Sequence, residues 1–217
     1  MADSSLWRHR QGQLIESLRA QPLLVVVRPS QSDWSSDRLE HGPLHGLIEQ
    51  LASVGVQHIE VAWVDHPLWL SLIRILQAHF PDLQLGIASV TSQKSLEEVI
   101  AVGVPYAMSP CFDPALLAQA RRHGQLLVPG VFSPTEVLQA VDFGCELVKL
   151  FPASCLGIDY RRQLSAPMTP LPCMIAAGGL RAEHLDPWLA AGYHALALGR
   201  GVINGAMLDP TLLSWLR

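Results

Sequence analysis

The chain has 217 residues, of which 49% are hydrophobic and 16% charged, so it can bury a large core and is not an intrinsically disordered protein. Its 15 basic and 19 acidic residues give a net charge of −4, without the basic stripe that is typical of a nucleic-acid binder. No apolar run approaches the ~18 residues of a membrane span, and residues 1–20 lack the apolar centre of a secretory signal. We therefore expect one domain over residues 1–217, located in the cytoplasm, that binds neither nucleic acid nor a membrane.

Strand-like and helix-like segments alternate along the chain. Short apolar runs predict strands at residues 23–28, 58–63, 83–90, 106–110, 126–131, 147–153, 173–179 and 195–201. Helix-like stretches follow them at residues 46–54, 67–80, 95–103, 113–124, 133–144, 158–164, 181–192 and 209–217. Asp113 and Ser133 precede prolines as capping residues do, and Gly103 and Gly144 stand where helices should end.

Eight such units predict an α/β fold, a (β/α)8 TIM barrel over residues 23–217. The strands are apolar on both faces, as buried parallel strands are. Residues 1–20 precede the first strand and are expected to form an extra N-terminal helix that closes the barrel floor. The alternative is an open, doubly wound sheet, which is less consistent with eight units and with the lack of a GxGxxG motif after the first strand.

Two ionisable residues interrupt apolar strands. Because strand side chains alternate between faces, Lys149 and Glu60 are expected to point into the barrel lumen. A buried lysine has a lowered pKa and can form a Schiff base with a carbonyl, while a nearby carboxyl can transfer protons. The alternative is that the two residues form a buried ion pair, with Glu60 a partner of Lys149 or Arg28.

Further candidates lie at the ends of strands, where TIM barrels place their active sites. Arg28 ends the first strand and offers a fork suited to a carboxylate or phosphate, or a salt bridge at the rim. Gly178 and Gly179 end the seventh strand, and Gly199-Arg200-Gly201 ends the eighth, where barrels often bind phosphate. These glycines could instead serve tight turns alone.

Other residue types carry weaker signals. The nine histidines form no ligand set and the four cysteines no paired motif, so no metal site is expected, and the cysteines are expected to be buried thiols. The long connection over residues 30–43 is expected to form a flap over the barrel mouth, with Trp34 positioned to cover a ligand.

The segment VKLFPA around Lys149 resembles the Schiff-base motif of class I aldolases that cleave 2-keto-3-deoxy-6-phosphogluconate (KDPG) and 4-hydroxy-2-oxoglutarate (KHG). The resemblance runs from about residue 20 to 205. The segments VVVR at 25–28, GVQHIEV at 55–61, LGIASV at 85–90, MSP at 108–110 and VPGV at 128–131 match in the same order. The chain departs from the family at single positions, with Ser89 and Ala177 where threonine is usual and Arg200 where a phosphate-binding serine is usual. It also has AWVD at 62–65 where a threonine-containing run is common, a longer connection at 30–43 and a short C-terminal helix.

The resemblance implies a carbon–carbon lyase of carbohydrate metabolism, as in the Entner–Doudoroff route, with pyruvate and an aldehyde as products. It implies no metal or cofactor, a small 2-keto acid as the partner, and a homotrimer. The implied site residues fall into three groups: catalytic Lys149 and Glu60; substrate-binding Arg28, Ser89, Pro110 and Phe151; and phosphate-binding Gly178, Gly179, Arg200 and Gly201. Two other classes stay open, a phosphate-binding barrel isomerase or synthase without covalent lysine catalysis, and a barrel that only binds a metabolite.

Overall fold

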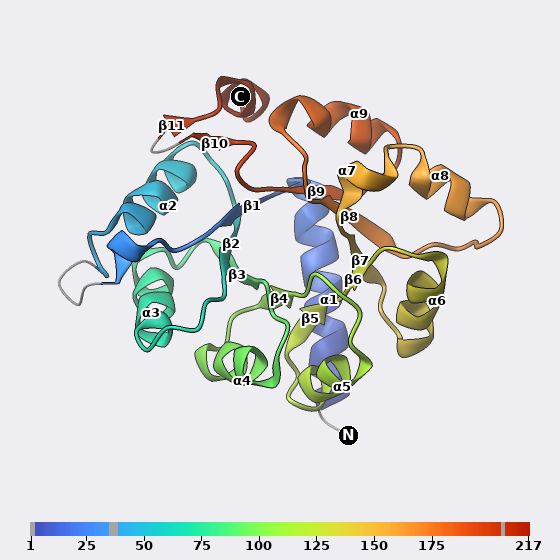
Figure 1. Cartoon of the computed structure of the whole chain (residues 1–217), viewed down its shortest axis with the longest axis horizontal. Helices are drawn as coiled ribbons and strands as arrows, with labels where there is room; N and C mark the ends of the chain where they lie inside the picture. Colours follow the sequence, from blue (N-terminus) through green and yellow to red (C-terminus); the bar gives the residue numbers. More distant parts are fainter. Residues whose placement is uncertain (1–2, 35–38, 205–206) are drawn as a thin grey trace.

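A computed structural model describes residues 3–34, 39–204 and 207–217 of the chain. Its strands surround a central axis and its helices form an outer layer (Figure 1). The main sheet contains β1 (Leu23–Val27), β2 (His58–Ala62), β3 (Gln84–Ala88), β4 (Tyr106–Met108), β5 (Leu126–Val128), β6 (Gly130–Val131), β7 (Leu147–Leu150), β8 (Cys173–Ala177) and β9 (Ala195–Leu198).

The strand order shows how the sheet closes. All pairings are parallel, in the order β5-β4-β3-β2-β1-β9-β8-β7-β6. Strands β5 and β6 continue one another across Pro129, which has no N–H to donate and so interrupts the ladder. The Lys149 N–H donates to the Pro129 carbonyl at 2.9 Å. Because Pro129 connects β5 to β6, which are the first and last strands of this order, the continuous segment of residues 126–131 closes the sheet. The predicted barrel is therefore confirmed, with one of its eight strands divided in two.

The helices follow the strands as predicted, with adjusted ends. They are α1 (Asp3–Ala20), α2 (Pro43–Ser53), α3 (Trp69–His79), α4 (Gln93–Val102), α5 (Pro114–Arg122), α6 (Pro134–Phe143), α7 (Ala153–Leu156), α8 (Tyr160–Ser165), α9 (Leu185–Ala190) and α10 (Pro210–Trp215), with 3-10 turns at Gln31–Asp33 and Ala182–His184. The weak helical segment predicted at 158–164 is α8, and the sequence analysis did not expect the additional short helix α7 that precedes it. A small antiparallel pair, β10 (Ile203–Asn204) and β11 (Met207–Leu208), precedes α10.

Helix ends follow local chemistry. The Asp113 carboxylate accepts hydrogen bonds from the N–H groups of Ala115 and Leu116, and the Ser133 hydroxyl accepts one from Glu136 N–H. Gly103 and Gly144 end α4 and α6 with φ of 69° and 96°, the left-handed region that glycine enters without strain. The caps predicted from sequence therefore position these helices around the barrel.

Helix α1 crosses behind the strands, at the end of the barrel opposite the view (Figure 1). Its Trp7, Leu14 and Leu18 are buried in the common core. The Ser17 hydroxyl lies 2.7 Å from Nε2 of His58, at the first residue of β2. The expectation that the N-terminal helix closes the floor is confirmed, and the other end of the barrel is left open.

The cysteine expectation holds only in part. All four cysteines carry free thiols, but Cys145 alone is buried, whereas Cys111 and Cys155 are exposed and Cys173 is partly exposed. Burial raises the pKa of the Cys145 thiol to about 12, so this group stays protonated. No helix in the described ranges is long and apolar enough to cross a membrane.

Candidate active site

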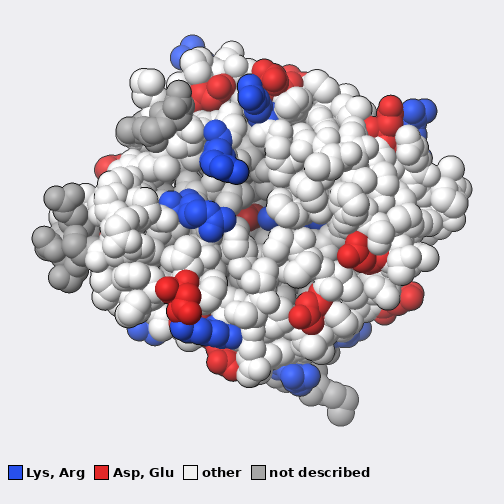
Figure 2. Space-filling model, in the orientation of Figure 1, with Lys and Arg blue, Asp and Glu red and all other residues white. Residues whose placement is uncertain are grey.

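A cavity of about 1270 Å³ opens at the carboxyl ends of the barrel strands. Lys and Arg side chains gather around a hollow on this face of the molecule (Figure 2). Nine residues expected from sequence line the cavity: Arg28, Ser89, Pro110, Lys149, Phe151, Gly178, Gly179, Arg200 and Gly201. The tenth, Glu60, is fully buried beside it. The structure therefore brings together residues from six strand ends and from the middle of β2, although 173 positions separate Arg28 from Gly201 in sequence.

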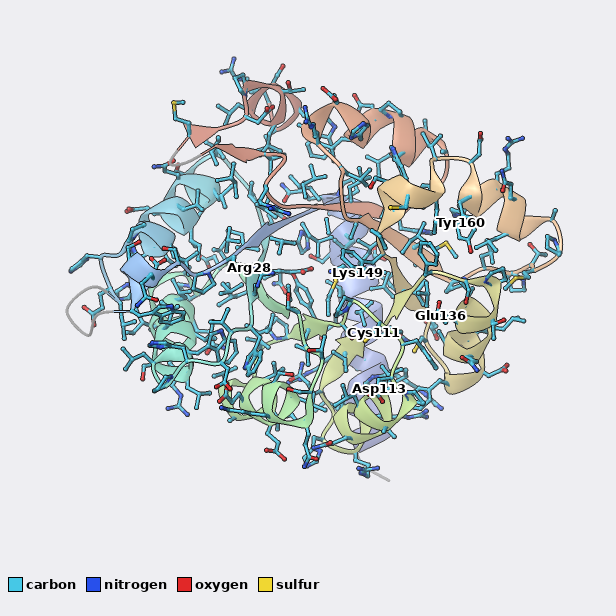
Figure 3. All side chains as sticks on the ribbon, in the orientation of Figure 1. Arg28, Cys111, Asp113, Glu136, Lys149 and Tyr160 are labelled. Atoms are coloured by element: carbon cyan, nitrogen blue, oxygen red, sulfur yellow. The ribbon has the colours of Figure 1, made fainter. Side chains whose placement is uncertain are left out.

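Lys149 extends from β7 into the lumen (Figure 3). Its Cα pairs with Gly130 on one side and Ile175 on the other, and its side chain lines the cavity. The residue is 6% exposed, and its Nζ lies 5.7 Å from the centre of the Phe151 ring. The second lysine of the chain, Lys94, is exposed and ion-paired with Asp65. Lys149 is therefore the one amine among the described residues that a ligand in this cavity can reach.

Glu60 lies on β2, in register with Val26 on β1 and Gly86 on β3. Its side chain is fully buried, and neither carboxylate oxygen accepts a hydrogen bond from a described residue. Burial raises the pKa of Glu60, and the positive charge of Lys149 opposes that rise. No ion pair within 4 Å joins Glu60 to Lys149 in the described part of the chain. The Glu60 carboxyl is therefore close enough to the Lys149 amine to interact with its charge, but the two groups do not form a salt bridge.

The lumen beside Glu60 is filled by an aromatic ring. A Cβ on Gly86 would lie 2.3 Å from the Tyr106 ring, so only glycine leaves room for that ring. The Tyr106 hydroxyl donates to the Gln84 carbonyl at 3.4 Å, and burial together with the charge of Glu60 raises the pKa of Tyr106. Tyr106 thus stays neutral and helps to keep the environment of Glu60 apolar.

Arg28 and Ser89 meet across the mouth of the cavity. Arg28 Nη2 donates to the Ser89 hydroxyl at 3.4 Å, and the described residues supply no carboxylate in ion-pair contact with this arginine. Ser89 has φ of 66°, a left-handed conformation that costs a non-glycine residue about 1–2 kcal/mol. The strained backbone aims the hydroxyl of Ser89 toward the guanidinium, and the pair offers donors to an anionic group.

The double glycine after β8 is required by close packing. Gly178 and Gly179 have φ of 92° and 77°. A Cβ on Gly178 would lie 2.9 Å from the Phe151 ring, and one on Gly179 would lie 2.1 Å from the Ser154 hydroxyl. Side chains at these two positions would clash, so the backbone itself forms this wall of the cavity.

Arg181 was missed by the sequence analysis. It lines the cavity with Arg200 and Gly201, and both arginines also line an adjoining hollow of about 280 Å³. None of the ion pairs found among the described residues involves either arginine. The sequence signal that could have identified Arg181 is its position, two residues after the double glycine that ends a predicted strand. The corner formed by Gly178, Gly179, Arg181, Arg200 and Gly201 is called the arginine corner below.

The connection over residues 30–43 is anchored beside the cavity. Asp33 is buried and accepts hydrogen bonds from Ser30 N–H, from the Ser30 hydroxyl and from Leu44 N–H, at 2.7–2.8 Å. The Trp34 ring stacks on His66 with 4.1 Å between ring centres and does not line the cavity. Trp34 therefore lies against His66 and not in the cavity lining, and the centre of the proposed flap, 35–38, lies outside the described residues, so the flap stays a prediction.

No group of three or more His, Cys, Asp and Glu side chains in the described ranges is arranged to share a metal ion. Among the described residues, the cavity brings together the Lys149 amine and the guanidinium groups of Arg28, Arg181 and Arg200, with the buried Glu60 carboxyl beside the amine. The Asp33 carboxylate also lines the cavity, but its hydrogen bonds to Ser30 and Leu44 already satisfy it. Such a set can bind an anionic carbonyl compound and move protons within it.

Comparisons with known proteins give a consistent result. A family model described as KDPG and KHG aldolase matches residues 16–211. The chain is 30% identical over 119 residues to a 2-dehydro-3-deoxy-phosphogluconate aldolase of Treponema pallidum, an alignment that spans 54% of this chain and 56% of that protein. It is 24% identical over 179 residues to a 2-dehydro-3-deoxy-6-phosphogalactonate aldolase of Escherichia coli, over 82% of each chain.

Solved structures share the fold. A KDPG aldolase from Legionella pneumophila, which holds pyruvate as a covalent carbinolamine, superposes with a TM-score of 0.79 at 23% identity over 97% of each chain. A cube-shaped cage designed by fusing symmetric oligomeric domains superposes with a TM-score of 0.73 at 21% identity, over 90% of this chain and 69% of the other.

Proposed function

The chain belongs to the KDPG and KHG aldolase family of carbon–carbon lyases, and we propose that it cleaves a 2-keto-4-hydroxy acid to pyruvate and an aldehyde through a Schiff base on Lys149. The observation that carries the proposal is the placement of Lys149 as the cavity's amine, with the unpaired carboxyl of Glu60 beside it. A buried ion pair seldom stabilises a fold more than apolar residues of equal size, so stability alone does not account for the two residues. The covalent intermediate in the Legionella enzyme supports the same chemistry.

The proposed reaction proceeds in balanced steps. The amine of Lys149 attacks the C2 carbonyl, the resulting C2 hydroxyl takes up a proton and leaves as water, and an iminium forms. Glu60, through a water, accepts the C4 hydroxyl proton, and the C3–C4 electron pair moves into the iminium as the bond breaks. The aldehyde leaves, the pyruvate enamine takes up a proton at C3, and water hydrolyses the resulting iminium to release pyruvate. The iminium is the electron sink, so these steps require no metal or cofactor.

The anionic groups of the substrate set the roles of the remaining residues. Arg28 and Ser89 bind the carboxylate next to the reacting carbonyl, since their donors meet at the cavity mouth. Pro110 and Phe151 wall the space around the three-carbon fragment. The distal anion, a phosphate or a carboxylate, binds at the arginine corner, where Arg181 and Arg200 replace the hydroxyl donors that the family usually has.

The same resemblance leads us to propose a single-domain protein that assembles as a homotrimer and works in the cytoplasm. The designed cage built from symmetric oligomeric domains is consistent with an oligomeric relative. Sedimentation velocity would test the trimer, and a single species at the mass of one 23.7 kDa chain would contradict it.

Borohydride trapping tests the covalent step. The protein is incubated with pyruvate and borohydride, digested, and analysed by mass spectrometry. We expect one reduced pyruvate adduct on Lys149, no adduct in Lys149→Met, and full labelling in the control Lys94→Met. Label on Lys94, or active enzyme without any label, would refute the mechanism and favour a barrel isomerase or synthase that does not use Lys149 covalently.

A further inference from the structure

The cavity continues from the lumen along one face of α2. Five α2 residues line it, and four of them, Pro43, Gly46, Leu47 and Gln50, are spaced at i, i+3, i+4 and i+7, so these four share one side of the helix. Ile203, in the segment after β9, lines the same cavity. The total volume of about 1270 Å³ exceeds the roughly 300–1,000 Å³ of an ordinary small-molecule pocket. This extension, lined by Pro43, Leu44, Gly46, Leu47, Gln50 and Ile203, is called the α2 arm.

The residues that define the α2 arm carry no charge, and Gln50 is the one among them with a polar side chain. Leu44 is buried, while Leu47 and Ile203 are partly exposed to the cavity. The nearby carboxylate of Asp33 is already satisfied by two backbone N–H groups and a hydroxyl. A ligand group in this arm therefore meets mainly the apolar side chains of Leu44, Leu47 and Ile203, whereas a group at the arginine corner meets guanidinium donors.

Gly46 keeps the α2 arm open. It stands inside α2, where glycine costs roughly 1 kcal/mol relative to alanine. Its backbone conformation is an ordinary helical one, so no turn requires glycine here. A Cβ at this position would have no atom within 4 Å, and Gly46 lines the cavity. A larger side chain at Gly46 would therefore begin in open space, at a position that lines the cavity.

We propose that the α2 arm binds an apolar substituent on the aldehyde half of the substrate. The enzyme then also cleaves and forms 4-hydroxy-2-oxo acids whose C4 substituent is an arylalkyl or branched alkyl group. This inference rests on the proposed function, because the reacting amine is again Lys149. In the synthetic direction, C3 of the pyruvate enamine attacks the aldehyde carbon, the aldehyde oxygen takes up a proton to become the 4-hydroxyl, and water hydrolyses the iminium.

The test compares two substrates that differ in the distal group. Cleavage of 4-hydroxy-2-oxo-6-phenylhexanoate releases pyruvate and 3-phenylpropanal, whereas cleavage of 4-hydroxy-2-oxoglutarate releases pyruvate and glyoxylate. Pyruvate release is followed for wild type, for Gly46→Phe, which fills the arm, and for Gly12→Phe. Gly12 is a matched control because it is also helical, lies in α1, and has no atom within 4 Å of a built Cβ.

We expect wild type to cleave both substrates. Gly46→Phe should lower kcat/KM for the phenyl substrate relative to the dicarboxylate by roughly 10- to 150-fold, which corresponds to the burial of one large apolar group. Gly12→Phe should leave the ratio unchanged. A wild type without activity on the phenyl substrate, or a ratio that Gly46→Phe does not change, would overturn the inference.

A binding measurement separates this inference from the proposed covalent chemistry. The analogue 2-oxo-6-phenylhexanoate lacks the 4-hydroxyl and cannot be cleaved, and its affinity is measured by calorimetry. If the analogue binds tightly, Gly46→Phe weakens this binding, and borohydride traps no pyruvate adduct on Lys149, the α2 arm is supported and the Schiff base is refuted. A trapped pyruvate adduct together with analogue binding no tighter than that of pyruvate would leave the aldolase in place and remove the arm.

Discussion

Replacement of Glu60 by glutamine distinguishes a proton-transfer group from one half of a structural ion pair. Burial raises the pKa of Glu60 above its ordinary value of 4.5, so the folded protein holds this proton to higher pH than the unfolded chain does. The stability that this proton provides is present below pH 4.5 and is lost as the pH rises through the raised pKa, by about 1.4 kcal/mol for each unit of pKa difference. Glutamine keeps the shape and cannot ionise.

We therefore expect Glu60→Gln to be more stable than wild type at pH 8 and about equal to it at pH 4.5. Each 1 kcal/mol should raise Tm by about 2–4 °C in a domain of this size. Turnover should fall ~10²–10⁴-fold, the usual contribution of general acid–base catalysis, while pyruvate is still trapped on Lys149. Thermal unfolding at the two pH values and a pyruvate-release assay measure these effects.

Glu136→Gln is a control of opposite sign. Burial acts to raise the pKa of Glu136, but hydrogen bonds from Phe132 and Ser133 outweigh it and hold the pKa below its ordinary value, so this variant should lose stability at pH 8. If Glu60 were an ion-pair partner, Glu60→Gln would instead cost about 3–5 kcal/mol by leaving Lys149 buried and unpaired. A loss of that size at pH 8 with near-normal turnover would refute the proposed role.

Three further predictions concern the cavity and the barrel floor. Arg200→Ala and Arg181→Ala should each lower kcat/KM for a phosphorylated substrate by roughly 10- to 150-fold, the value of one lost contact to a charged group; unchanged values in a pyruvate-release assay would mean that the glycine amides alone bind the anion. Ser89→Gly should raise the free energy of unfolding by about 1 kcal/mol by relieving the left-handed backbone, and should raise KM through loss of the hydroxyl; an unchanged or lower Tm would contradict this. Burial lowers the pKa of His58 from 6.5 to about 4, so its contribution to stability is present above pH 6.5 and is lost toward pH 4, by up to about 3 kcal/mol. Urea unfolding from pH 7 to 4 should therefore show a shallower loss in His58→Gln than in wild type, and parallel slopes would speak against it.

The sequence by itself determined the barrel fold and the face of the sheet on which the two central site residues, Lys149 and Glu60, lie. Eight apolar runs with intervening helical stretches are a local pattern, and Cβ direction along a strand depends only on the backbone. The lumen-facing positions of Lys149 and Glu60 therefore followed from alternation, and the register of β2 and β7 agrees with it. The ends of α4 and α6 likewise followed from Gly103 and Gly144, because left-handed helix ends are a property of the residue itself.

Only the tertiary structure decided which loop residues reach the cavity. Apart from its position after the double glycine, no sequence pattern distinguishes Arg181 from the other arginines of the chain. Its place beside Arg200 in the cavity lining depends on the pairing of β8 with β9, which brings the ends of these strands together. Trp34 was expected over the mouth, but it stacks on His66 because a partner from another strand end lies within reach. The sequence did not predict the α2 arm. The space beside Gly46 is open because no other segment of the folded chain lies within 4 Å of a Cβ built there, and no residue pattern indicates this. Strand periodicity fixes orientation locally, whereas contacts between loops depend on distances between segments far apart in the chain, and those are set when the barrel closes.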